Sequence, residues 1–229
     1  IDICAYGDGA RLVARAREFA CEQFRRIRFG KEPCLEIQAG RQAEPRMGWS
    51  GETIDTTMLA ATIGVDQPIE RDVRRKVMTH LAIGGKEDIG SGLVLVSVVI
   101  DIERIGDYTK NIYDLAVNHP EKLEGGITED RLVEIENISL KLVEDSIDAF
   151  KNQNIEKARN LMGLYKKNIS SQCDTITNDI ISGKVEDIKV GRATAIALYA
   201  RYLKRIAAHS RNLISSIVNP FERIGYPEK

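Results

Sequence analysis

The sequence predicts an all-α protein built from two tandem three-helix bundles. Apolar residues recur at intervals of three and four along most of the chain after residue 66, the spacing of one face of an α-helix. No stretch alternates polar and apolar residues with the period of a β-strand. A helical segment also recurs weakly at an offset of 101 residues, which indicates a duplicated unit.

Composition and charge narrow the class of protein. The 229 residues include 33 Lys plus Arg and 34 Asp plus Glu. The resulting net charge of −1 does not attract nucleic acid or anionic membrane. The longest apolar run, residues 93–100, is far shorter than the roughly 20 residues of a membrane-spanning helix. Without a signal peptide or a CxxC pair, we expect a cytoplasmic protein with free thiols.

Composition changes near residue 66. Residues 1–66 hold eight Arg and one Lys, whereas residues 67–229 hold eleven Arg and thirteen Lys. Arg11–Phe29 is compatible with a helix, but residues 30–51 contain two prolines and four glycines without a sustained period. Either a variable N-terminal segment or a change of reading frame would explain this change in the Arg and Lys content. We expect residues before 66 to be the least ordered part.

Two helices are predicted next. The first runs from Glu70 to Ile83 and is stopped by Gly84-Gly85. The second runs from about Lys86 to Val117, before a break at Asn118-His119-Pro120. Its seam follows a bundle-type stripe with one carboxylate inside it: Val94, Val98, Asp101, Ile105, Tyr108, Ile112 and Leu115.

Three further helices complete the chain. Thr128 is expected to cap the first of them, whose buried face is predicted at Leu132, Ile135, Ser139, Leu142, Ser146 and Ala149. The next helix follows the turn at residues 152–154 and ends near Ser182, before Gly183. The last runs from about Asp187 to Val218 and stops at Asn219-Pro220.

The repeat sets the predicted domains. Val94–Val117 aligns with Ala195–Val218, with identical pairs Arg104/Arg205, Ile105/Ile206, Asn111/Asn212 and Val117/Val218. The period is too long for a solenoid, so we predict duplicated three-helix units. The first unit spans residues 1–118, the second 127–219, and a tail 220–229. The first unit needs a helix before Glu70, and Arg11–Phe29 is the candidate.

One acidic pair is a candidate metal site. Glu103 and Asp107 are four residues apart, on one helix face, so their charges repel unless a cation lies between them. Such oxygen ligands suit Mg, Ca, Mn or iron. The alternative is a solvated acidic face. Asp101, inside the seam, is expected to bond Arg104 or a helix end instead of a metal.

The sequence lacks the motifs of several known kinds of enzyme site. No Glu-x-x-His pair, P-loop or GxSxG elbow occurs in the sequence. His209 occupies a seam position and is expected to pack in the core. The basic cluster Arg71, Arg74, Arg75 and Lys76 is either a solvated helix face or a docking surface. It lacks the interleaved aromatic residues that stack on nucleic-acid bases.

Several helical segments carry recognisable motifs. Residues 101–107, Asp-Ile-Glu-Arg-Ile-Gly-Asp, followed by Asn111-Ile112, are similar to the helix signature of the PhoU family, the phosphate-uptake regulators. Residues 73–81 resemble its preceding helix, and residues 202–206 with Asn212 resemble its second-repeat signature. Residues 219–226 resemble the tail of stand-alone members. The resemblance covers about residues 69–226.

The resemblance implies that acidic-xxx-Asp pairs bind metal clusters on the bundle surface, with a second pair from the neighbouring helix. It therefore assigns a divalent or iron cation to Glu103 and Asp107, in the first repeat only. The equivalent positions of the second repeat are Lys204 and Ala208, and residues 166–168 offer Lys-Lys-Asn where acidic residues are usual. In the first repeat the partner pair would fall at residues 62–65, which carry no carboxylate, so Asp66 and Glu70 are the nearest substitutes.

The resemblance also implies a regulatory, non-enzymatic role. We expect a cytoplasmic regulator of phosphate homeostasis, a dimer or larger, peripheral to the membrane at most. It would contact the cytoplasmic components of a phosphate transporter, a sensor kinase, or both, and no nucleic acid. The alternative is a metal-binding bundle that senses or sequesters the ion, and a third, weaker alternative is an enzyme with an unrecognised site. Metal stoichiometry separates the first two, because storage needs several ions per chain.

Overall fold

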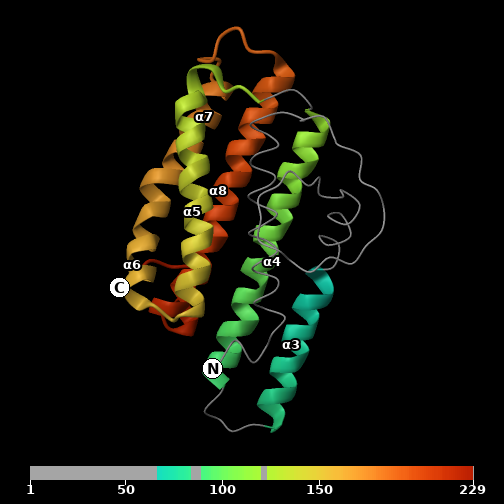
Figure 1. Ribbon diagram of the computed structural model, residues 1–229, viewed down its shortest axis with the longest axis vertical. Helices are drawn as coiled ribbons and strands as arrows, with labels where there is room; N and C mark the ends of the chain where they lie inside the picture. Colours follow the sequence, from blue (N-terminus) through green and yellow to red (C-terminus); the bar gives the residue numbers. More distant parts are fainter. Residues whose placement is uncertain (1–65, 84–88, 120–122, 229) are drawn as a thin grey trace, which may run out of the picture.

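A computed structural model describes residues 66–83, 89–119 and 123–228 of the chain (Figure 1). These residues contain helices and no strand, which confirms the all-α prediction. The helices are α3 (Asp66–Ile83), α4 (Ile89–Asn118), α5 (Glu129–Lys151), α6 (Ile155–Leu164), α7 (Ser171–Ile181) and α8 (Val190–Val218). Short helical turns are η3 (Gly126–Thr128), η4 (Tyr165–Ser170) and η5 (Phe221–Arg223). The candidate helix Arg11–Phe29 and the segment 30–51 lie outside the described residues.

The second unit packs α5, the α6–α7 segment and α8 around one apolar core (Figure 1). All six residues predicted for the inner face of α5 are buried, which confirms that face. They meet buried side chains of the other helices, among them Leu161, Ile169, Ile176, Ile196, Leu203 and Ile206. None of the helices in the described part of the chain is long and apolar enough to cross a membrane.

The ends of α5 and α8 differ from the predictions. Thr128 is the residue before α5, but its hydroxyl donates to the Gly125 carbonyl at 2.8 Å instead of capping the helix. The Glu129 carboxylate accepts from the Gly125 N–H at 2.6 Å, so this side chain fixes the turn. α8 begins at Val190, later than predicted, because Asp187 adopts a left-handed backbone conformation with φ 53°.

The helix predicted from residue 155 to Ser182 is interrupted. Asn154 caps α6 by accepting from the Lys157 N–H at 2.9 Å. A π-helical turn, η4, then separates α6 from α7 without a change of direction in the chain. α7 ends before Gly183, whose φ of 72° matches the predicted glycine stop.

In the first unit, α3 lies against α4. Val73 and Val77 of α3 and Val99 of α4 form a small buried cluster. At Gly92 of α4 an added Cβ would lie 3.0 Å from the Leu81 side chain, so the absence of a side chain permits this close approach.

The two units meet through α4 and α8, which run in opposite directions (Figure 1). Residues Val98 and Ile102 of α4 are buried with Leu213 of α8. Ile105 and Ile206, equivalent by the 101-residue offset, are only 4% and 0% exposed and belong to one core cluster. The superposition of the two repeats and the boundaries of the two units remain predictions.

We expect Ile105→Ala and Ile206→Ala each to lower the free energy of unfolding by about 2–5 kcal/mol, because each leaves a cavity in the same core. Chemical denaturation monitored by circular dichroism measures this loss. Ile181 is 77% exposed at the end of α7, so Ile181→Ala is the control and should cost less than about 0.5 kcal/mol. Equal losses in all three variants would contradict the assignment of this core.

Candidate functional site

α4 carries two polar clusters on different faces. The carboxyl cluster consists of Glu103 and Asp107 with Glu70 of α3. The interunit network joins α4 to α8 and consists of Asp101, Tyr108, Arg205, His209 and Asn212. Because residues four apart share a helix face, Glu103 and Asp107 lie together. Asp101 and Tyr108 belong to the seam that faces α8.

Glu70 and Glu103 form a hydrogen-bonded carboxyl pair across α3 and α4. The hydrogen bond to Glu70 raises the pKa of Glu103 from 4.5 to about 7, with smaller contributions from burial and from the charges of Glu70 and Asp107. The Arg104 charge opposes this rise in the pKa. Glu70 is also paired with Arg74, with a distance of 2.5 Å from Nη2 to Oε1. Glu103 therefore holds its proton up to near-neutral pH.

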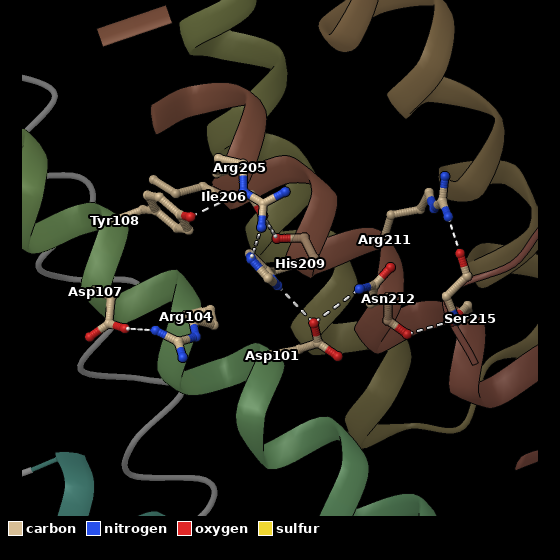
Figure 2. A network of polar contacts seen from close by, with 12 residues as sticks. Asp101, Arg104, Asp107, Tyr108, Arg205, Ile206, His209, Arg211, Asn212 and Ser215 are labelled. Carbon is tan, nitrogen blue, oxygen red and sulfur yellow. Dashed lines mark hydrogen bonds and ion pairs between the residues drawn. The ribbon is translucent and has the colours of Figure 1, made fainter. Parts of the chain in front are cut away.

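Asp107 is neutralised by a residue of its own helix. Arg104 Nη1 donates to Asp107 Oδ2 at 2.9 Å, and both side chains are about half exposed (Figure 2). The expectation that Asp101 bonds Arg104 or a helix end is therefore wrong. Arg104 turns toward Asp107, and Asp101 turns toward α8 instead.

The carboxyl cluster supplies oxygen ligands that a hard cation can use. Glu70, one of the two substitutes named from the sequence, lies beside Glu103 as a second helix's contribution. Two of the three carboxyl groups are, however, paired with arginine. Within residues 66–83, 89–119 and 123–228, no group of three or more His, Cys, Asp or Glu side chains is arranged to hold a metal ion. A cation would therefore compete with a proton and with Arg104.

The second unit carries an ion pair at the equivalent position. Lys204 Nζ lies 2.6 Å from both carboxylate oxygens of Asp174, which belongs to α7. The lysine thus supplies the positive charge on the face where the first unit has Glu103. Sequence reasoning identified Lys204 but missed Asp174, because it looked for the partner at residues 166–168.

The interunit network is shown in Figure 2. Asp101 Oδ1 accepts from Asn212 Nδ2 at 3.0 Å and lies 2.7 Å from His209 Nδ1. Arg205 Nε donates to the Tyr108 hydroxyl at 3.1 Å, and its Nη2 lies 3.3 Å from His209 Nε2. The rings of Tyr108 and His209 stack with centroids 5.8 Å apart. These contacts tie one helix of each unit together.

His209 was expected to pack in the core, and its side chain is indeed only 12% exposed. The ring is held by polar partners on both nitrogen atoms, so packing is only part of its role. The helical seam placed His209 and Asp101 correctly on inward faces. The sequence did not reveal that these faces lie against each other.

The sequence of this chain is similar to those of PhoU proteins. The PhoU domain matches residues 132–217, which lie within α5–α8. The phosphate-specific transport system accessory protein PhoU homologue of Clostridium acetobutylicum is 27% identical over 177 residues, 73% of this chain and 78% of that protein. The homologue of Pseudomonas aeruginosa is 27% identical over 124 residues, and the match spans 52% of this chain and 50% of that protein.

Two solved structures share the fold. The crystal structure of PhoU from Pseudomonas aeruginosa has a TM-score of 0.71 at 18% identity, covering 94% of this chain and 97% of that chain. The phosphate transport system regulatory protein PhoU from Streptococcus pneumoniae has a TM-score of 0.67 at 16% identity, covering 93% of this chain and 91% of that chain.

We expect the carboxyl pair to make stability depend on pH. The folded protein holds the Glu103 proton up to a pKa of about 7, whereas the unfolded chain releases it near 4.5. The resulting stabilisation is fully present below pH 4.5 and is lost as pH rises through about 7. Glu103→Gln should remove this loss, so the variant gains stability relative to the wild type as pH rises.

Urea denaturation between pH 4.5 and 8 measures this difference. Glu134→Gln is the matched control, because Glu134 is exposed on α5, away from the pair. Its stability curve should run parallel to that of the wild type. Parallel curves for Glu103→Gln would contradict the shared proton.

Proposed function

This chain belongs to the PhoU family, and we propose that it is an accessory regulator of phosphate transport that acts by binding other proteins. The observation that carries this proposal is the agreement of sequence and fold over the second unit. The PhoU match at residues 132–217 coincides with the bundle of α5–α8. The named relatives are accessory and regulatory proteins of phosphate transport systems.

The proposed partners are the cytoplasmic components of a phosphate transporter, a sensor kinase, or both. We place the protein in the cytoplasm as a homodimer, where it regulates phosphate homeostasis without catalysing a reaction. The buried free thiol of Cys173 is compatible with a reducing compartment. Its pKa is raised to about 12, chiefly by burial, so the thiol is unreactive.

Affinity capture of the tagged full chain, from cells grown in high and in low phosphate, tests this role. We expect transporter or kinase subunits to be recovered in amounts that depend on phosphate. Ile206→Asp is the control, because a carboxylate in the core disrupts the fold and leaves only non-specific capture. Failure to recover either class in both conditions would contradict the proposal.

A second candidate function is ion sensing, and the Glu70–Glu103 pair favours it. We propose that one divalent or iron cation binds at Glu103 and Asp107, beside Glu70. Binding displaces the proton of Glu103 and the Arg104 guanidinium, so the affinity is modest and rises with pH. The Lys204–Asp174 ion pair occupies the equivalent face of the second unit, where a cation would be repelled.

Metal titration by calorimetry tests this site. Glu103→Gln combined with Asp107→Asn should abolish binding, because both acidic ligands are lost. Arg104→Ala should tighten binding, since it removes the competing cation, and Lys204→Ala should leave it unchanged. Binding in the double amide variant would refute the assignment. More than one ion per chain would favour sequestration over regulation.

A further inference from the structure

The contacts of the interunit network distinguish the two nitrogen atoms of the His209 ring. An arginine side chain carries hydrogen-bond donors and no acceptor. Arg205 Nη2 lies 3.3 Å from His209 Nε2, so this nitrogen is placed as the acceptor. His209 Nδ1 lies 2.7 Å from Asp101 Oδ1, so Nδ1 is placed as the donor. These contacts match the tautomer that carries its proton on Nδ1.

The surroundings of the ring leave few charges to consider. Asp101 and Tyr108 face it from α4, and Arg205 faces it from α8. The neighbouring cations have other partners. Arg104 pairs with Asp107, and Arg211 donates to the Gly225 carbonyl. The side chains of His209 and Asp101 are only 12% and 14% exposed, so solvent screens their interactions weakly.

We propose that His209 is a proton-operated switch that controls the position of Arg205. A proton on Nε2 removes the acceptor of Arg205 and places two positive charges side by side. The bond from Nδ1 to Asp101 is kept and becomes an ion pair. Protonation therefore breaks the contact between the Arg205 guanidinium and the His209 ring while α4 and α8 stay joined.

The predicted duplication points to a second, non-ionic contact beside the switch. The 101-residue offset places Asp101 at the equivalent of Tyr202, and His209 at the equivalent of Tyr108. The pair Asp101–His209 thus corresponds to the pair Tyr202–Tyr108, whose ring centroids are 6.2 Å apart. The same contact occurs once as an acid–histidine pair and once as an aromatic pair. The aromatic pair holds the units together while the polar pair changes its charge.

This inference goes beyond the proposed function, because it adds proton concentration as an input and does not depend on any partner or metal. Nitrogen-15 NMR of the full chain tests it. At pH 8 we expect His209 to show a protonated Nδ1, with Arg205 guanidinium protons protected from exchange. On acidification, we expect the His209 ring shifts and the loss of Arg205 protection to share one midpoint.

Two variants make the test specific. In His209→Gln the amide nitrogen can donate to Asp101 and the amide oxygen can accept from Arg205. This variant should therefore keep Arg205 protected throughout the titration. Tyr202→Phe alters the aromatic pair only and should leave the shared midpoint unchanged. A proton on Nε2 at pH 8 would overturn the proposal. So would Arg205 signals that ignore the titration of His209, or a pH step that persists in His209→Gln.

Discussion

The antiparallel contact between α4 and α8 is the interaction on which the rest of the structure depends. α8 contacts every helix of the second unit and also α4, so its apolar residues serve two interfaces. Ile105 of α4 and Ile206 of α8 are both buried in the same apolar cluster. The polar groups of this interface are paired with each other, which avoids the cost of burying them alone.

Because of helical geometry, the acidic side chains within residues 101–107 of α4 face different partners. Asp101 faces α8 and closes the interunit network, whereas Glu103 faces α3 and shares a proton with Glu70. Asp107 is neutralised within its own helix by Arg104. Each carboxyl group within residues 101–107 therefore has a different counterpart: a histidine, a second carboxyl group and an arginine. One short motif thus connects three helices and both units.

Local pattern predicted much of the fold, because helical period, glycine stops and inward faces are properties of neighbouring residues. The six buried positions of α5 and the seam of α4 were read correctly in this way. Contacts between distant helices were not predictable. The pairing of Asp101 with His209 and of Lys204 with Asp174 depends on how helices are rotated against each other. A periodic stripe identifies a face but not the residue opposite to it.

The π-helical turn at Tyr165–Ser170 has a consequence for how such charge sites change during evolution. A π turn places more residues in one turn than an α-helix does, so every residue after it is rotated relative to those before it. Asp174, which follows this turn in α7, is the residue that faces Lys204. Insertion or deletion of one residue within the turn would present a different charge at this surface. The charge of this surface can thus change without the substitution of any residue that lies on the surface.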